Sequence, residues 1–203
     1  DMSTELSEFV GKLRQLEIGE KSDPLAIDYQ IGSYRLRGLL DGVYEHGNLF
    51  YRYSKSKAKD QLHAWLNHLI FINAGATVET SYLHKDGEWK FSAVDDSQAN
   101  LLALLNAYRA AQTQLSPLLM SPALEYIKRE LDINSRSKKT PQDMASEAFE
   151  TEFKQDAYFQ LLYRGGNSEE LLESDVFLQS IDEIFRPVFM ARPAIRFDSE
   201  SAV

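Results

Sequence analysis

The chain contains no cysteine among its 203 residues, which excludes disulfides, thiolate catalysis and cysteine metal sites together. This absence fits a reducing compartment, so the cytoplasm is the expected location. No continuous apolar run approaches the roughly eighteen residues that a membrane helix needs, and no charged-then-apolar signal segment begins the chain. We therefore expect a soluble protein with no role in a membrane.

Several catalytic motifs are also missing. The chain has no GxxxxGK[ST] phosphate loop, no HExxH zinc motif and no GxSxG nucleophile turn. His63 and His68 are five residues apart and would face different sides of a helix, so ordinary histidines are favoured over metal ligands. Gly165-Gly166 could cradle an anion, but a turn that ends a helix is the simpler interpretation. No cofactor is expected in this domain.

The net charge of −9 argues against a uniformly basic surface for nucleic acid. One stretch differs, because residues 35–59 hold six basic residues against two acidic ones, Asp41 and Glu45. A locally basic element on an acidic protein is compatible with one surface that faces phosphate, whereas solvated strand and helix ends would give the same composition. The six basic residues are Arg35, Arg37, Arg52, Lys55, Lys57 and Lys59.

Residues 34–71 form the segment around which the chain is organised. Two runs of aromatic and branched residues, Tyr34–Tyr44 and Leu49–Tyr53, flank His46-Gly47-Asn48, which predicts a hairpin. Apolar residues then recur at the spacing of one helix face from Leu62 to Ile70. The segment is therefore predicted as strand, turn, strand and helix.

Helices and strands alternate along the first 120 residues, and helices alone follow. A helix over residues 1–15, a strand over Leu25–Ile31 and a second hairpin around Asp86-Gly87 are predicted. We expect an α/β (α+β) fold with a mixed sheet, flanking helices and a helical final third. The core would span 1–120 and the helical extension 121–203, packed on the same core as one domain. Because residue 1 is not methionine, we expect a piece of a longer chain.

Other predicted features concern helix ends. Asp95 or Asp96 caps a long helix that Pro117 ends, and Asn73-Ala74-Gly75 ends the central one. A helix over 122–131 and a polar loop over 134–139 are predicted next. Thr140 then caps a helix with Pro141 at its first position. The last predicted helix, over 175–190, ends or kinks before Pro187, and a mobile tail follows Arg192.

The central hairpin carries the only pattern with a catalytic counterpart. In a common nuclease core, two carboxylates on neighbouring strands and a nearby lysine collect a divalent metal around one phosphate. Asp41 supplies the first carboxylate here. The second strand supplies Arg52-Tyr53-Ser54 where an Asp-aromatic-Lys triplet would be expected.

This pattern resembles the RecB-type branch of the PD-(D/E)XK nucleases. Gly38 and Asp41 match its GxxD, and Gln61 to Trp65 matches its QLxxY with Trp for Tyr, whereas Arg52 and Ser54 depart from its DYK. A closer resemblance, over roughly residues 24–190, is to the carboxyl-terminal region of the RecC family, the gamma subunits of exodeoxyribonuclease V. The runs that carry it are YRYSKSKAKDQLHAWLNHLIFINAG, LHKDGEWKFSAV and DAYFQLLYRGG.

The resemblance implies a domain with an inactive nuclease-like fold in an ATP-dependent helicase-nuclease that unwinds double-stranded DNA ends in recombinational repair. It implies RecB and RecD as partners, with RecD held near the carboxyl-terminal region, and Mg²⁺ and ATP used by other subunits. The apolar helix face of Phe177, Phe185 and Phe189 could serve this docking, although burial within the domain is the favoured use of most of these residues.

A charge argument independently predicts that the core has lost its metal. At about 4.5 Å and an effective dielectric near 20, a cation such as Arg52 repels a divalent ion by roughly 7 kcal/mol. Asp41 would then be a strand-end carboxylate that could pair with Arg52 in place of a metal. Gln61 and Trp65 would be remnants of the fold, Trp65 in the core and Gln61 as a polar contact. Arg52 and the three lysines could face DNA or an acidic subunit surface.

Three functions remain open from the sequence. The first is a non-catalytic, DNA-guiding and structural domain. The second is a divergent metal-dependent DNA nuclease that recruits its missing ligand from Asp28, Glu45 or Asp60. The third is a stand-alone interaction domain with no role on DNA. A fold does not by itself decide among them.

Overall fold

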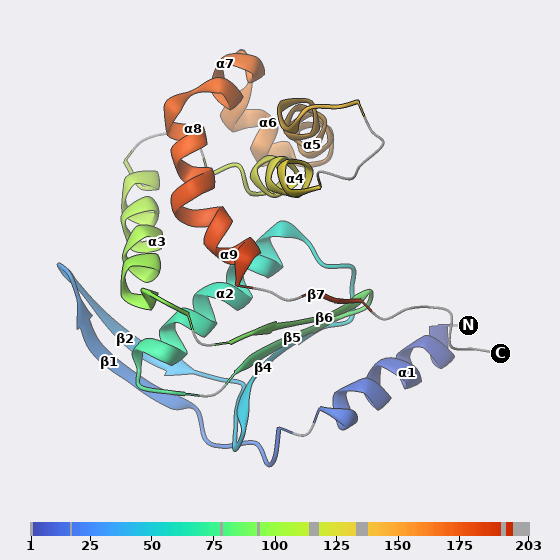
Figure 1. Ribbon diagram of the computed structural model, residues 1–203, viewed down its shortest axis with the longest axis vertical. Helices are drawn as coiled ribbons and strands as arrows, with labels where there is room; N and C mark the ends of the chain where they lie inside the picture. The colour runs from blue at the N-terminus through green and yellow to red at the C-terminus, as the bar shows by residue number, and fades with distance from the viewer. Residues whose placement is uncertain are drawn as a thin grey trace. The chain divides into compact units, whose positions relative to one another are not determined.

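The computed structural model describes residues 2–16, 18–77, 79–92, 94–113, 118–132, 138–191 and 194–196. The chain divides into two compact units, one of residues 1–102 with 191–203 and one of residues 103–190. We call them the α/β unit and the helical unit (Figure 1). Helices and strands of both kinds are present, so the predicted α+β class is confirmed.

The α/β unit contains a five-stranded sheet and a separate two-stranded sheet. Its elements are α1 (Met2–Gln15), β1 (Leu25–Ile31), β2 (Tyr34–Leu40), β3 (Val43–Tyr44), β4 (Gly47–Arg52), α2 (Ala58–Asn73), β5 (Thr80–His84), β6 (Gly87–Phe91), the start of α3 (Ser97–Ala111) and β7 (Ala194–Arg196).

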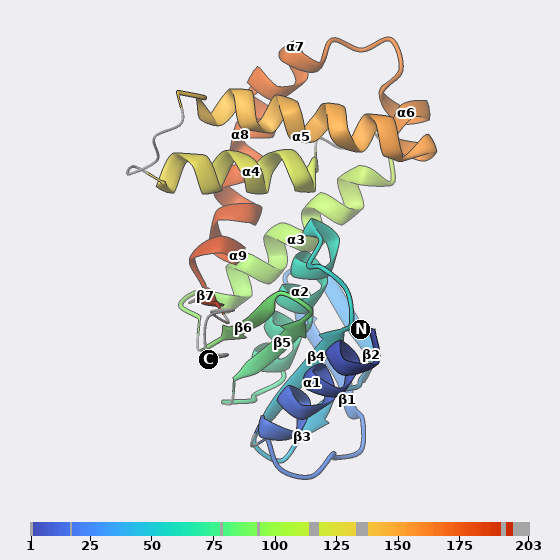
Figure 2. The ribbon, with the colours of Figure 1, turned by 90° about the vertical axis from the view of Figure 1, so that its right-hand side faces the viewer.

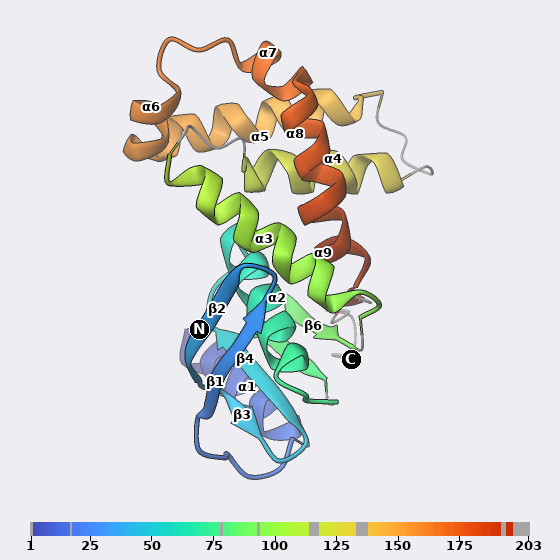
Figure 3. The same ribbon diagram turned by 90° about the vertical axis from the view of Figure 1, so that its left-hand side faces the viewer.

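The five-stranded sheet is mixed, in the order β3-β4-β5-β6-β7. β4 and β5 run parallel, and the other neighbours are antiparallel. A parallel pair needs a crossover, and α2 supplies it between β4 and β5. α2 covers one face of the sheet and α1 the other, as the opposite views in Figure 2 and Figure 3 show. Phe9 of α1 packs on Tyr53, with ring centroids 5.2 Å apart.

Helix α2 forms as its apolar spacing predicts. Ala64, Trp65 and Leu69 are at most 1% exposed and lie on the face that packs toward the sheet. Trp65 contacts Phe91 of β6 with ring centroids 5.5 Å apart. The predicted stop is confirmed, because the helix ends at Asn73 and Gly75 adopts a φ of +97° that favours glycine. The second hairpin is also confirmed as β5 and β6.

The first hairpin differs from the prediction. β2 pairs along its whole length with β1 in the two-stranded sheet, and only Val43–Tyr44 pairs with β4. The predicted strand over 34–44 is therefore two strands in two sheets. The break lies at Gly42, whose φ is +75°, where a Cβ atom would lie 2.5 Å from the carbonyl oxygen of Leu49. The close approach requires glycine and turns the chain between the sheets.

The β1–β2 hairpin packs against the carboxyl-terminal end of α2. Ile27, Leu40 and Phe71 form a buried cluster there, each at most 7% exposed. The hydroxyl of Tyr29 also donates to the carbonyl of Ile70 at 3.4 Å. Apolar burial thus attaches the small sheet to the helix.

The helical unit is built from short helices around their own buried residues. Thr140 caps α5 by accepting from the N–H of Asp143, and Pro141 occupies the first turn, as predicted. Phe177 and Phe185 are at most 1% exposed within this unit. Its elements are the end of α3, then α4 (Met120–Leu131), α5 (Pro141–Gln155), α6 (Ala157–Tyr163), α7 (Ser168–Glu173), α8 (Asp175–Ser180), a π-helix (Ile181–Phe185) and α9 (Arg186–Met190).

The helix around Pro187 does not end before the proline. The N–H of Arg186 donates to Ile181, five residues back, so the preceding turn widens into a π-helix and the chain then continues as α9. Proline has no N–H to donate, and the wider turn lets the helix pass through this position. Pro117, most of the loop over 134–139 and the tail after Arg192, apart from 194–196, lie outside the described residues.

The boundary between the compact units falls inside α3, at residues 102 and 103. The sequence placed the end of the core at residue 120, and the packing of the extension on that core stays a prediction. In the part of the chain that the structure describes, no helix is both long enough and apolar enough to cross a membrane.

Candidate nucleic-acid interface

Asp41 lies in the bend between β2 and β3 and is paired with a residue that sequence reasoning did not consider. Its carboxylate lies 3.1 Å from the amine of Lys21, with 71% of the side chain exposed. The backbone N–H of Gly42 and then Lys21 lower the pKa of this carboxyl. Lys21, not Arg52, is therefore the cation beside Asp41.

Arg52 ends β4 and is held by the first turn of α2. Its Nη1 lies 2.5 Å from Oδ1 of Asp60, whose side chain is 8% exposed against 45% for Arg52. The second oxygen of Asp60 accepts from the backbone N–H of Lys57 at 3.3 Å and so caps the helix. One carboxylate thus joins the end of the strand to the start of the helix.

The other three nuclease-type positions make internal contacts. Ser54 donates to the carbonyl of Lys55 at 3.2 Å. Gln61, 6% exposed, donates to the hydroxyl of Ser56 at 3.4 Å, and Trp65 is 1% exposed in the core. The interpretation of Trp65 as core and Gln61 as a polar contact agrees with these positions.

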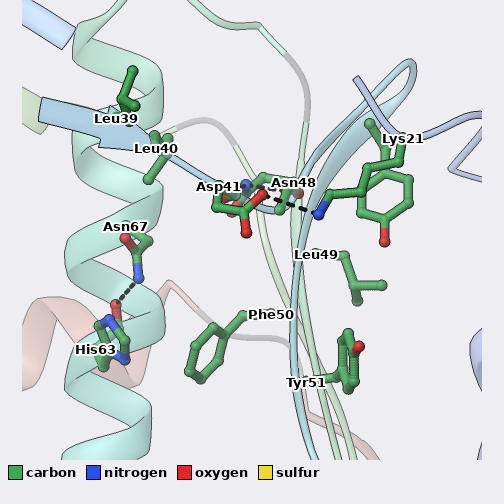
Figure 4. Close-up of a pocket in the computed structure, with 12 residues that line it drawn as sticks. Lys21, Leu39, Leu40, Asp41, Asn48, Leu49, Phe50, Tyr51, His63 and Asn67 are labelled. Carbon is green, nitrogen blue, oxygen red and sulfur yellow. Dashed lines mark hydrogen bonds and ion pairs between the residues drawn. The ribbon is translucent and has the colours of Figure 1, made fainter. Parts of the chain in front are cut away.

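A pocket of about 320 Å³ opens beside Asp41, between α2 and β4 (Figure 4). Arg52, Ser54, Gln61 and Trp65 are not among the residues that line it. Of the five positions of the nuclease pattern, this pocket therefore contains only Asp41. The residues that line the pocket are Lys21, Leu39, Leu40, Asp41, Gly42, Tyr44, Asn48, Leu49, Phe50, Tyr51, His63 and Asn67.

A family model for the RecC C-terminal domain matches residues 1–131. The chain belongs to the RecC C-terminal domain family. Its relative in Escherichia coli (strain K12), the RecBCD enzyme subunit RecC, is 30% identical over 112 residues. That match covers 54% of this chain and 10% of the relative, so the chain spans only a small part of the length of the curated protein it matches. The resemblance to RecC is confirmed, whereas the PD-(D/E)XK relationship stays a prediction.

The matched region includes every residue of the nuclease pattern and ends with α4. Of the three carboxylates that a divergent nuclease could recruit in this RecC-type domain, two have an arginine beside them and the third lies near a histidine that is charged only when protonated. Asp28 pairs with Arg35, Glu45 lies 4.0 Å from His46, and Asp60 pairs with Arg52. Within the described ranges, no three His, Asp or Glu side chains are grouped so that they could hold a metal.

Five of the six basic residues of 35–59 fall into two groups, and the sixth, Arg52, pairs with Asp60. Arg35 and Arg37 lie on β2 and contact Asp28 at 2.8 and 3.4 Å, and Arg35 is the main cause of the lowered pKa of Asp28. Lys55, Lys57 and Lys59 lie at the amino-terminal end of α2. The two groups therefore lie on different elements of the α/β unit. That they face one phosphate-binding surface stays a prediction.

The three lysines differ from the arginines in their surroundings. Lys55, Lys57 and Lys59 are exposed, and no ion pair to any of them occurs among the residues whose placement is described. A cation at the amino-terminal end of a helix faces the positive end of the helix dipole, which is unfavourable unless an anion is near. This end of α2 is therefore suited to an anionic partner such as a phosphate.

His68 is a buried histidine in the core of α2. Its Nε2 lies 2.8 Å from the carbonyl of Ser92 and must donate there, so Nδ1 accepts from the Thr80 hydroxyl at 2.9 Å. Burial lowers the pKa of His68 to about 4. His68 and the exposed His63 face different sides of the helix, as their spacing predicted.

Sequence reasoning missed the residues of the pocket apart from Asp41. Lys59, His63 and Asn67 recur every four residues, a spacing that could have indicated one polar face of α2. Phe50 and Lys21 carry no such signal, because their part in the pocket depends on how β4 and the loop before β1 are placed.

Proposed function

We propose that this chain is a non-catalytic, structural and DNA-guiding domain of a RecBCD-type helicase-nuclease. Such a complex uses ATP to unwind and degrade double-stranded DNA ends in recombinational repair. Membership of the RecC C-terminal domain family and the E. coli relative, a RecBCD enzyme subunit, support this proposal. RecB and RecD would be its partners in the cytoplasm, and Mg²⁺ and ATP would be used by those subunits.

The observation that carries the non-catalytic part is the ion pair between Arg52 and Asp60. In a metal-dependent nuclease, the position of Arg52 would hold a carboxylate that binds the metal. Here a guanidinium lies 2.5 Å from the buried Asp60 carboxylate, which also caps α2. A divalent ion that used Asp60 would have to displace this arginine and weaken the cap, and both changes cost free energy.

The competing function is a divergent metal-dependent DNA nuclease, and the exposed carboxylate of Asp41 is the feature that favours it. Calorimetric titration of Mg²⁺ and Mn²⁺ into the 203-residue chain, alongside a nuclease assay on linear duplex and single strands, separates the two. We expect no binding heat and no cleavage. Metal binding and cleavage that both disappear in Asp41→Ala would establish an enzyme and end the proposal.

The DNA-guiding part rests on the three lysines at the start of α2. Their exposed ammonium groups can contact backbone phosphates, and release of counterions would make this binding depend on salt. A stand-alone interaction domain, the third possibility, would leave DNA binding absent at every salt concentration. Fluorescence anisotropy with a labelled single strand at several salt concentrations distinguishes the two.

The surface that would hold RecD is α6 rather than the buried phenylalanine face. Tyr158, Leu161 and Leu162 are 82%, 56% and 58% exposed, whereas Phe177 and Phe185 are inside the helical unit. Residues 141–190 carry eleven acidic and three basic residues, so this apolar patch lies in an acidic part of the sequence. Exposed apolar groups of this kind mark interaction surfaces when they are grouped.

Pull-down of the assembled complex tests this docking surface. The change of Tyr158, Leu161 and Leu162 to serine in the complete RecC-type subunit should release RecD and leave RecB bound. The matched control is Tyr108→Ser, because Tyr108 of α3 is 66% exposed and lies outside α6. Retention of RecD by the triple variant would contradict the docking proposal and would leave the DNA-guiding part untouched.

A further inference from the structure

Helix α2 carries a polar stripe that leads from the exposed lysines to the pocket. Lys59, His63 and Asn67 are four residues apart in turn, so they lie on one face of the helix. Lys59 and His63 are exposed and Asn67 is half-buried. His63 and Asn67 also line the pocket, which makes the stripe continuous with it (Figure 4).

The pocket wall is aromatic where the helix and the strand face each other. The rings of Phe50 on β4 and His63 on α2 meet edge to face, with centroids 4.7 Å apart and planes at 75°. Tyr51, the next residue of β4, also lines the pocket and is 55% exposed, but its side chain lies on the opposite side of the strand from Phe50 (Figure 4). Aromatic side chains of this kind form sequence-tolerant platforms for the bases of single strands.

Polar groups at the rim could form hydrogen bonds with a planar heterocycle. The amide nitrogen of Asn67 donates to the carbonyl of His63 at 3.0 Å, which directs its Oδ1 away from that bond as an acceptor. Asp41 and Lys21 lie at the mouth as an ion pair at 3.1 Å. Because Lys21 offsets the charge of Asp41, the mouth does not present an isolated negative charge to a nearby phosphate.

The size of the pocket limits the ligand. Its volume of about 320 Å³ is at the lower end of the roughly 300–1,000 Å³ typical of small-molecule sites. A single base fits this volume better than a whole nucleoside triphosphate, and Lys59 lies one helical turn away for the phosphate of the same nucleotide.

We propose that this pocket binds one unstacked base of a single DNA strand, with the adjoining phosphate at Lys59. The site would hold a strand in register as it passes the domain, without reading its sequence. This inference rests on the proposed DNA-guiding function and adds to it a base contact between α2 and β4.

The test compares two oligomers of equal length, one of thymidine and one of abasic deoxyribose phosphate, by fluorescence anisotropy with the 203-residue chain. We expect the thymidine oligomer to bind at least about fivefold more tightly, which is the lower end of what one stacked base contributes. His63→Ala should abolish this difference without changing the affinity for the abasic oligomer. His63→Phe should keep the difference, because it preserves an aromatic ring.

The matched control is His46→Ala, since His46 is also exposed but does not line the pocket. It should leave both affinities unchanged. If the unaltered chain binds the two oligomers equally, the base pocket is overturned and the DNA-guiding function stands. The same holds if His63→Ala and His46→Ala reduce the affinity for the thymidine oligomer equally. Failure of the unaltered chain to bind either oligomer would overturn both.

Discussion

The two ends of α2 differ in how they are attached to the protein and in how their charges are used. At the carboxyl-terminal end, the helix is anchored by apolar burial of Phe71 against the β1–β2 hairpin. At the amino-terminal end, it is anchored by the ion pair and cap that Asp60 makes with Arg52 and Lys57. One helix thus has an apolar anchor and a polar anchor.

The basic residues of the β1–β2 hairpin and those at the amino-terminal end of α2 also differ, in how far their charge is already neutralised. Arg35 and Arg37 on the hairpin share the Asp28 carboxylate, so part of their charge is already neutralised. Lys55, Lys57 and Lys59 have exposed side chains and no ion pair in the described part of the structure. Composition alone makes the two groups look equivalent, whereas their neighbours make only the lysines suited to an external anion.

The largest effect is expected from removal of the apolar anchor. Phe71 is 4% exposed, and Phe71→Ala should lower the free energy of unfolding by about 3–5 kcal/mol, since it removes buried apolar area and leaves a cavity. Urea denaturation followed by circular dichroism measures this loss. Phe71→Leu is the control, and we expect it to cost much less. A loss below about 1 kcal/mol for Phe71→Ala would contradict an apolar anchor at this end.

In the middle of α2, the buried His68 should make the stability of the protein depend on pH without involving either anchor. Because burial lowers the pKa of His68 from 6.5 to about 4, the folded state binds its proton more weakly than the unfolded state. The contribution of neutral His68 to the free energy of unfolding is therefore complete above pH 6.5. It is lost as the pH falls toward 4, and the loss amounts to at most about 3 kcal/mol. Urea denaturation at pH 7.5 and pH 4.5 measures it.

The control for this pH dependence is His68→Gln, which cannot take up the proton in this range. It should show a shallower decrease of stability between the two pH values than the unaltered chain. The same decrease in both proteins would assign the pH dependence to the carboxylates and not to His68.

A smaller effect is expected from removal of the polar anchor. Asp60→Ala breaks the pair with Arg52 and the cap at Lys57, and should cost about 1–2 kcal/mol in thermal or urea denaturation. Asp28→Ala is the matched control, because Asp28 also pairs with arginine but is exposed, and its loss should be smaller. Equal losses at the two sites would mean that burial of Asp60 does not strengthen this anchor.

The smallest effect on stability is expected for the lysines, where the change should appear in DNA binding. Glutamate at positions 55, 57 and 59 should leave the denaturation curve almost unchanged. It should reduce the slope of log affinity against log salt for single-stranded DNA by about 2, because each lost phosphate contact contributes about 0.7. Arg35→Glu with Arg37→Glu is the control and should change this slope less. If the slope changed more in the arginine variant than in the lysine variant, the arginines and not the lysines would be the residues that contact DNA.

Much of the fold was predictable because it depends on local chemistry. The apolar spacing around Trp65, the stop at Gly75 and the turn at Asp86-Gly87 each act within a few residues, and each forms as predicted. The cap at Thr140 with Pro141 is equally local. Backbone preferences and periodic burial are properties of short segments, so the sequence is sufficient to indicate them.

The candidate site was predictable only in part. The sequence shows Arg52 where the nuclease pattern predicts a carboxylate, but it indicated Asp60 only as an alternative metal ligand and not as the partner of Arg52. The pairing depends on how the end of β4 meets the first turn of α2. Lys21 reaches Asp41 because the loop before β1 passes β3, where Lys21 forms an isolated bridge with Tyr44. Contacts between separate segments of this kind have no local signal.

The sequence by itself determined the α+β class and the amphipathic central helix, because each follows from residue type and spacing. The tertiary structure decided which charges are neutralised inside the protein and which remain exposed. It also decided that residues 34–44 divide between two sheets at Gly42. The physical reason is that ion pairing, burial and sheet partnership depend on distances between segments, and those distances exist only once the chain has folded.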